Sequence, residues 1–280
     1  MRIRVGHLYP DYLNIYADRG NIAVLAERAR RRGHELDVAA IGLGDPVPGD
    51  FDLYYVGGGQ DREQELVAPD LAGKSEALRA AVEDDAAFLA VCGGYQLLGR
   101  SYRDVAGAEL PGIGLLPLQT VAGTTRMIGD VLLDCPWAGR TLAGFENHAG
   151  RTLLDAEAEP LGHVLAGFGN DGVSGQEGCR YRRAYGTYLH GPLLPRNPWF
   201  ADRILADALA HRTGGEAPQL EPLDDELELA AHEVSSARLA AGEEPLDRRM
   251  HDDVGELVGR KEARALHGSV LRLDVVEPAV

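Results

Sequence analysis

The first 91 residues alternate short apolar runs with segments whose apolar residues recur at helical spacing. Strands are predicted at 3–8, 35–41, 52–56 and 86–91, and helices at 21–32 and 71–85. The run at 86–91 is wholly apolar, as expected of a strand that is covered on both faces. Strands that alternate with helices predict an α/β fold with a largely parallel sheet.

The pattern changes in the middle of the chain, where glycines interrupt β-rich segments. Segments 115–121, 124–133 and 141–145 predict antiparallel strands that are added to the same sheet. A late strand at 183–189 and a helix at 199–212 then complete the pattern. The expected architecture is three layers, a mostly parallel sheet flanked by helices.

The last quarter of the chain differs in charge. The whole sequence carries a net charge of −16, and residues 216–280 hold 16 acidic and seven basic residues. Two glycines at 214 and 215 and Pro218 mark a boundary at the start of this segment. We therefore expect one domain over 1–213 and an acidic helical extension over 214–280. Its apolar stripe is formed by Leu246, Met250, Val254, Leu257 and Val258.

Composition excludes several classes of protein. A strongly acidic chain lacks the positive surface that nucleic acid requires. No run approaches the ~18 apolar residues of a membrane span, and the first residues lack a signal-peptide core, so we expect a cytoplasmic protein that does not insert into a membrane. Three cysteines in 280 residues are read as reduced thiols, and their spacing from the histidines matches no metal motif.

Cys92 is the strongest candidate for chemistry. It follows the apolar run 86–91 and precedes two glycines, after which a short helix is predicted. A buried cysteine in a glycine turn is the ordinary alternative, but strand, cysteine, two glycines and helix are typical of a nucleophile elbow. The helix N-terminus favours the thiolate, and the N–H of Gly93 is then placed to bind an oxyanion.

A cysteine nucleophile needs a base, and His190 is the best placed of nine histidines. It ends the predicted strand 183–189 and is followed by a Gly-Pro turn, so a rigid edge would hold it. The alternative is a strand-end histidine bonded to backbone, and the presence of Cys92 favours the catalytic interpretation. Cys135 and Cys179 lack a comparable setting and are interpreted as structural.

Three glycines at 57–59 follow the predicted strand 52–56. Such a loop lets backbone N–H groups approach a ligand closely. It could cradle a phosphate, although it lacks the Lys-Ser/Thr pair of a phosphate-binding loop. The alternative is a second oxyanion donor that faces Cys92.

Together these features resemble a class I glutamine amidotransferase domain of flavodoxin-like fold. The segments 144–150 (GFENHAG) and 186–191 (GTYLHG) resemble the branch named for cobyric acid synthase. Segments 8–11 (LYPD) and 14–21 (NIYADRGN) are similar to the GatD type, the glutaminase subunits of lipid II isoglutaminyl synthases. The resemblance covers roughly residues 1–213.

The resemblance implies that the chain hydrolyses L-glutamine to glutamate and ammonia. It assigns the nucleophile to Cys92, the base to His190 and the binding of the glutamine carboxylate to Arg126. Arginine suits that role because its guanidinium offers two parallel donors. The oxyanion hole is assigned to Gly58, Gly59 and Gly93.

One position departs from the pattern of most class I amidotransferases. They place a glutamate two residues after the catalytic histidine to orient its ring, and here that residue is Pro192. A third catalytic group would therefore come from elsewhere, either from Glu146 or from a carboxylate of a partner. The polar cluster of Glu146, Asn147 and His148 is equally compatible with a hairpin held by local hydrogen bonds.

The resemblance also implies a partner that consumes the ammonia. This sequence contains no P-loop or other nucleotide motif, so no cofactor is expected in this chain, and ATP and Mg are expected on the partner. The partner would be a Mur-ligase-like synthetase of the MurT type, forming a heterodimer and amidating the D-glutamate of lipid II to D-isoglutamine. The alternatives are a glutaminase that feeds another synthetase of the cobyrinate type, a cysteine hydrolase of the α/β-hydrolase kind, and a non-catalytic binding module.

Overall fold

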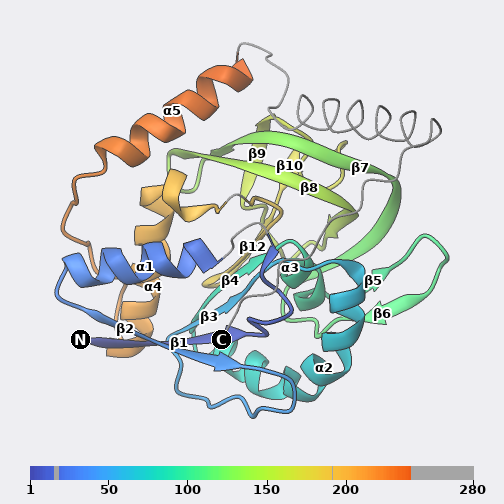
Figure 1. Ribbon diagram of the computed structural model, residues 1–280, viewed down its shortest axis with the longest axis horizontal. Coiled ribbons are helices and arrows are strands. Elements are labelled where there is room, and N and C mark those ends of the chain that lie inside the picture. The colour runs from blue at the N-terminus through green and yellow to red at the C-terminus, as the bar shows by residue number, and fades with distance from the viewer. Residues whose placement is uncertain (16–18, 191, 241–280) are drawn as a thin grey trace, which may run out of the picture. The chain divides into compact units, whose positions relative to one another are not determined.

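Six strands form a mostly parallel sheet. The computed structural model describes residues 1–15, 19–190 and 192–240 (Figure 1). The strands of this sheet, called sheet A, are β1 (Arg2–Leu8), β2 (Glu35–Ile41), β3 (Leu53–Val56), β4 (Ala87–Val91), β11 (Cys179–Tyr181) and β12 (Ala184–Thr187). Their order is β11-β12-β4-β3-β1-β2, and every neighbouring pair is parallel except β11–β12. The strands predicted before residue 92 are therefore confirmed.

Helices cover both faces of sheet A. They are α1 (Arg19–Arg31), α2 (Asp61–Glu83), α3 (Gly93–Leu98) and α4 (Pro198–Thr213). The chain also forms a 3₁₀ helix, η2 (Leu194–Arg196), and a further helix, α5 (Glu226–Ala240). Helices α1 and α4 contact each other on one face, and α2 contacts α3 on the other (Figure 1). Every residue of β3, β4 and β12 is buried between them.

Helix α2 begins ten residues earlier than its apolar spacing predicted. The predicted helix spans 71–85, whereas the structure runs the helix from Asp61 to Glu83 and through Pro69. Proline removes a backbone donor and usually ends a helix. Glu65, whose carbonyl would receive the missing bond, is exposed, so water can bind there in place of the lost N–H.

The middle of the chain forms a second sheet, called sheet B. Its strands are β5 (Ser101–Arg103), β6 (Glu109–Pro111), β7 (Leu118–Cys135), β8 (Arg140–Leu154), β9 (Gly162–Ala166) and β10 (Gln176–Glu177). The order is β10-β9-β7-β5-β6, and β8 pairs with β7. The prediction that these strands extend the parallel sheet is wrong, because β12 takes the place beside β4 and β7 pairs with β8, β9 and β5. The segments predicted as two strands are the single strand β7, with a shift of register between Ala122 and Met127.

A β-bridge between Phe145 and His190, the predicted base, joins the two sheets. The N–H of His190 donates to the carbonyl of Phe145 at 2.7 Å, and the N–H of Phe145 donates back to the His190 carbonyl at 3.3 Å. Phe145 lies in β8, and His190 follows β12. The predicted base is therefore held where sheet A meets sheet B.

The C-terminal part that the structure describes packs onto this framework. Helix α4 ends at Thr213, and Gly214 follows with a φ of +66°. Helix α5 then contacts β7, β8 and η2, and the ring of His232 lies 2.9 Å from the Thr141 hydroxyl and 3.1 Å from the Arg196 carbonyl. The domain boundary at 213/214 stays a prediction, and the apolar stripe at 246–258 lies outside the described residues.

An ion-pair cluster ties α5 to the helices that cover sheet A. Arg28 donates to Asp202 at 2.6 Å and to Asp225 at 2.5 Å, and Arg32 donates to Asp202 at 2.8 Å. Both arginine side chains are about 5% exposed or less. The cluster links α1, α4 and the residue just before α5. Among the described residues, no helix combines the length and the apolar character that crossing a bilayer requires.

Candidate active site

Cys92 lies in a strained turn between β4 and α3. Its φ of 49° and ψ of −109° place a residue with a side chain where such residues are rare, at a cost of about 1–3 kcal/mol. The turn is tight: a Cβ on Gly93 would lie 2.8 Å from the Gly59 carbonyl oxygen, and one on Gly94 would lie 2.7 Å from that of Gly57. The strand, turn and helix expected of a nucleophile elbow are therefore present, and Cys92 keeps 8% of its surface exposed.

The backbone of the glycine loop shows which N–H groups face the elbow. The Gly57 carbonyl accepts the N–H of Gly94 at 3.1 Å, so the N–H of Gly58, on the same trans peptide, points away from the elbow. The Gly58 carbonyl accepts the N–H of Ile15 at 3.1 Å, so the N–H of Gly59 points away from Ile15. The Gly59 nitrogen lies 3.0 Å from the Cβ position of Gly93. Of the two glycines assigned to the oxyanion hole, Gly59 is the one whose N–H is directed toward the elbow.

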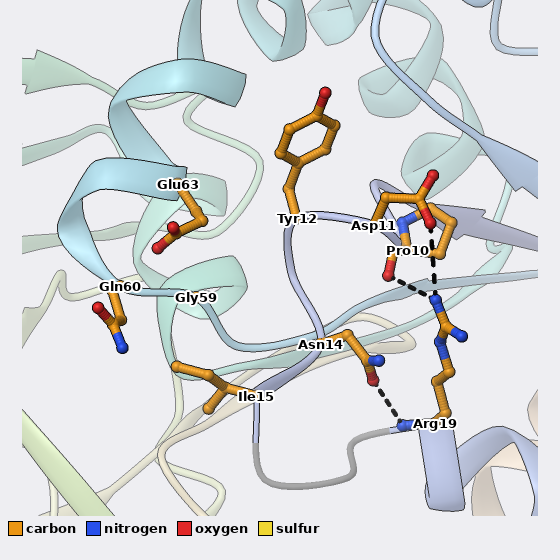
Figure 2. A pocket seen from close by; sticks show the side chains of 9 residues that line it. All are labelled: Pro10, Asp11, Tyr12, Asn14, Ile15, Arg19, Gly59, Gln60 and Glu63. Carbon is orange, nitrogen blue, oxygen red and sulfur yellow. Dashed lines mark hydrogen bonds and ion pairs between the residues drawn. The ribbon is translucent and has the colours of Figure 1, made fainter. Parts of the chain in front are cut away.

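A loop after β1 supports the glycine loop from the side opposite the elbow. The Leu13 side chain fills the space over Gly59, where a Cβ would clash with it. Figure 2 shows the cavity of about 380 Å³ that these two loops line together with α2. It lies at the carboxyl ends of β1 and β3, where the strand order reverses and ligands of open α/β sheets commonly bind. In this cavity the Arg19 guanidinium donates to the Pro10 carbonyl at 2.9 Å and lies 3.7 Å from Asp11.

His190 and Cys92 follow neighbouring parallel strands at the same end of sheet A. Thr187, the last residue of β12, is paired with Val91, the last residue of β4. The Cys92 N–H donates to the Thr187 carbonyl at 2.8 Å, which fixes the two strand ends together. His190, three residues later, is fully buried. The structure thus brings the nucleophile and the base predicted from sequence to one edge of the sheet.

Arg126 lies on β7, within the shift of register between Ala122 and Met127, and is exposed. Its guanidinium donates to the Asn147 side-chain oxygen at 2.9 Å and to the Asn147 carbonyl at 3.0 Å. Burial raises the pKa of Tyr102, on the neighbouring strand β5, to about 12; the charges of Asp61 and Asp104 add to this, and the Arg126 charge opposes it. The binding of the glutamine carboxylate by Arg126 stays a prediction.

Glu146 serves the hairpin and the neighbouring histidine. Its fully buried carboxylate accepts the backbone N–H of Phe168 at 2.6 Å and of Gly169 at 2.9 Å. Its other near neighbour is His148, whose Nε2 lies 3.5 Å away. Burial lowers the pKa of His148, and its Nδ1 lies 2.9 Å from the Gly150 carbonyl. The Glu146 carboxylate thus holds the segment after β9, whereas the bond of His148 to Gly150 is local to β8. A role of Glu146 in orienting the base stays a prediction.

A buried hydrogen-bond chain behind the elbow was not predicted from sequence. Gln64 donates to Gln96 at 3.0 Å, Gln96 donates to the Tyr188 hydroxyl at 3.1 Å, and Thr152 lies 2.6 Å from that hydroxyl. The His148 ring stacks on Tyr188 at 3.5 Å. The chain links α2, α3, β8 and the segment after β12. Its one sequence signal is Gln96, a polar residue on a helix whose other residues are apolar or glycine.

The other two cysteines are inert by comparison. Cys135 and Cys179 are fully buried, and burial raises the pKa of each thiol to about 12. All three cysteines are free thiols. Within residues 1–240, apart from the gaps named above, no group of three or more His, Cys, Asp or Glu side chains is arranged to hold a metal ion.

Comparison with known proteins identifies two groups of relatives. The GatD subunit of the glutamine-hydrolysing lipid II isoglutaminyl synthase of Staphylococcus aureus (strain N315) is 39% identical over 233 residues, which cover 83% of this chain and 94% of that subunit. A cobyric acid synthase of Synechococcus sp. (strain CC9605) is 35% identical over 165 residues, which cover 56% of this chain but 32% of the synthase.

The fold and a family model agree with these relatives. The structure of PurLQS from Thermotoga maritima superposes with a TM-score of 0.50 over 76% of this chain and 99% of that chain. The identity there is 14%, so this likeness concerns the fold alone. The model of the CobB/CobQ-like glutamine amidotransferase domain matches residues 4–198. The chain belongs to the CobB/CobQ-like glutamine amidotransferase family.

Proposed function

We propose that this chain is the glutaminase subunit of a lipid II isoglutaminyl synthase. The observation that carries the proposal is the extent of the match to the Staphylococcus aureus subunit, which spans 94% of that protein. The cobyric acid synthase matches over 32% of its own length. The greater extent and identity of the match to the GatD subunit favour the isoglutaminyl type over the cobyrinate type.

The geometry supports a thioester mechanism. The Cys92 sulfur forms a bond to the amide carbon of L-glutamine, and the N–H groups of Gly93 and Gly59 bind the oxyanion that results. The carbon–nitrogen bond then breaks, and His190 delivers a proton so that ammonia leaves. Water attacks the thioester, glutamate is released and Cys92 regains its proton. Arg126 binds the α-carboxylate of glutamine throughout these steps.

The ammonia is consumed by a separate synthetase subunit. A Mur-ligase-like partner, which binds ATP and Mg, activates the α-carboxyl of D-glutamate in lipid II, and ammonia converts it to D-isoglutamine. This chain contacts lipid II only through that partner. We expect the chain to act in the cytoplasm, on the side of the membrane where lipid II is assembled.

The test is transfer of an isotopic label. The chain is co-expressed with a Mur-ligase-like protein, purified as a complex and given ATP, lipid II and glutamine that is labelled in its side-chain amide. Mass spectrometry should find the label in the amide of the peptide stem. Label that appears only as free ammonia, with lipid II unchanged, would refute this acceptor and return the cobyrinate type to consideration. The Cys92→Ala complex, supplied with free ammonium, is the matched control for the synthetase half.

A further inference from the structure

A buried carboxylate reaches from sheet B to the segment that carries the proposed base. Glu177 ends β10 and is fully buried. It accepts the hydroxyl of Thr187 at 3.0 and 3.1 Å through its two oxygens, and the backbone N–H of Tyr188 at 2.7 Å. These contacts anchor the segment that leads to His190 on a side chain of sheet B.

Thr187 uses its hydroxyl and its carbonyl to fix three other residues. Its hydroxyl donates to Glu177 and accepts the N–H of Leu189 at 3.0 Å. Its carbonyl accepts the N–H of Cys92 at 2.8 Å. The backbone N–H groups from 188 to 190 are thus all engaged, since that of His190 donates to Phe145. One residue therefore relates the position of the nucleophile to that of the base.

We propose that Glu177 and Thr187 form a positioning unit that holds His190 at the correct place relative to Cys92. The proposal rests on the glutaminase function proposed above. Most class I amidotransferases orient the histidine through a glutamate at the position that Pro192 occupies here. In this chain the backbone that carries the histidine is anchored by a carboxylate from another sheet.

The burial of Glu177 costs folding free energy. It raises the pKa of Glu177 to about 8, and the charge of Glu146 adds to that, whereas the hydrogen bonds from Tyr188 and Thr187 lower it. With a pKa of about 8 the buried Glu177 is mostly protonated at neutral pH, and its unprotonated oxygen still accepts hydrogen bonds in that form. A carboxyl group this deep, without a cationic partner among its described contacts, is retained at the expense of stability.

The experiment compares Thr187→Val with Thr187→Ser in the full chain. Valine keeps the shape of threonine and removes the hydroxyl, whereas serine keeps the hydroxyl. A displacement of about 1 Å in a catalytic group can cost about 100-fold. We therefore expect Thr187→Val to lower kcat of glutamine hydrolysis about 10- to 100-fold with KM within about threefold of wild type, and Thr187→Ser to stay within about threefold in both.

A second measurement distinguishes a positioning role of Thr187 from an effect on folding, and it does not depend on the proposed glutaminase function. The rate of Cys92 alkylation by iodoacetamide is followed against pH, with mass spectrometry to confirm the site. Cys135 and Cys179 remain silent because their pKa values lie near 12. The profile of Thr187→Val should move to higher pH, because a displaced His190 stabilises the thiolate less, and that of Thr187→Ser should not.

The outcomes are distinct. Equal kcat values and equal alkylation profiles for the two threonine variants overturn the positioning unit. If Thr187→Val does not fold, Glu177→Gln carries the same test, because the amide keeps the size of the carboxylate and loses one acceptor oxygen. A wild-type complex of this chain with the Mur-ligase-like partner that releases no glutamate refutes the proposed function, while the alkylation profiles, which need no glutamine, still decide the positioning unit.

Discussion

Replacing Ile15 by proline tests how the oxyanion hole is held. The N–H of Ile15 donates to the Gly58 carbonyl and so orients the peptide whose other end is the N–H of Gly59. Proline removes that N–H. The backbone at Ile15 is in a 3₁₀ conformation, whose φ range includes the value that proline fixes. Ile15→Ala, which keeps the N–H and loses the side chain, is the matched control.

The size of the effect follows from one hydrogen bond. A net contribution of about 0.5–1.5 kcal/mol corresponds to a change of about two- to tenfold in the fraction of enzyme with the peptide correctly oriented. Complete loss of an oxyanion donor costs about 10²–10³ in kcat, which sets the upper limit. The peptide keeps two supports, the bond from Gly94 to Gly57 and the packing of Leu13 on Gly59. We therefore expect a two- to tenfold decrease in kcat and not the decrease of about 10²–10³ that complete loss of the donor would cause.

The assay is steady-state release of glutamate by the purified chain. Ile15→Pro should lower kcat about two- to tenfold and leave KM nearly unchanged, because the oxyanion exists only after the substrate is bound. The melting temperature of both variants shows whether the fold is intact. If Ile15→Pro and Ile15→Ala have the same kcat, the Ile15 N–H does not orient the donor and the reasoning is refuted.

Three further predictions concern other parts of the molecule. Cys92→Ser should abolish glutamine hydrolysis with the fold retained, because serine there lacks a base strong enough to ionise it, and activity within tenfold of wild type would contradict the role of Cys92. Arg126→Ala should raise KM for glutamine about 10- to 100-fold through loss of a charge-assisted contact of about 1.5–3 kcal/mol, with an unchanged KM as the opposing result. Asp202→Asn should lower the free energy of unfolding by about 3 kcal/mol at neutral pH, because it leaves buried Arg28 and Arg32 short of a carboxylate. Burial opposes ionisation of Asp202, but the two arginines outweigh burial and hold the pKa of Asp202 below its ordinary value. The contribution of Asp202 to the free energy of unfolding is therefore present above about pH 4 and is lost as the pH falls further. Chemical denaturation at neutral and acidic pH should show that the difference in stability between wild type and variant shrinks at acidic pH.

Local patterns predicted every strand of sheet A except β11, because each signal lies within a few residues. The apolar run before Cys92 and the glycines after it define strand, turn and helix together, and the strained φ of Cys92 agrees with that interpretation. The second sheet was missed because alternation identifies a strand but not its neighbour. Whether β7 joins β4 or pairs with β8 depends on contacts between distant segments, and β12 decided it by taking the edge of β4.

The supporting residues of the site could not be predicted from their surroundings in the sequence. Glu177 lies among glycines and polar residues, where a carboxylate is ordinarily solvated, yet it is fully buried against Thr187. Gln64 lies on a helix rich in charge and is buried against Gln96. In each case the partner is a polar residue on another element, so only the folded chain reveals the pair.

The two-sheet arrangement has a consequence for the order in which the molecule is made. The neighbours β4 and β12 are separated in the chain by the whole of sheet B, so a ribosome releases β4 and all of sheet B before it releases β12. Until residue 187 emerges, one edge of β4 is unpaired and the Cys92 N–H lacks the carbonyl that receives it. Pairings this distant form late and slowly, and an open strand edge invites association with other chains. The nascent chain thus contains Cys92 long before β12 positions it for catalysis. An incomplete chain is therefore not expected to hydrolyse glutamine.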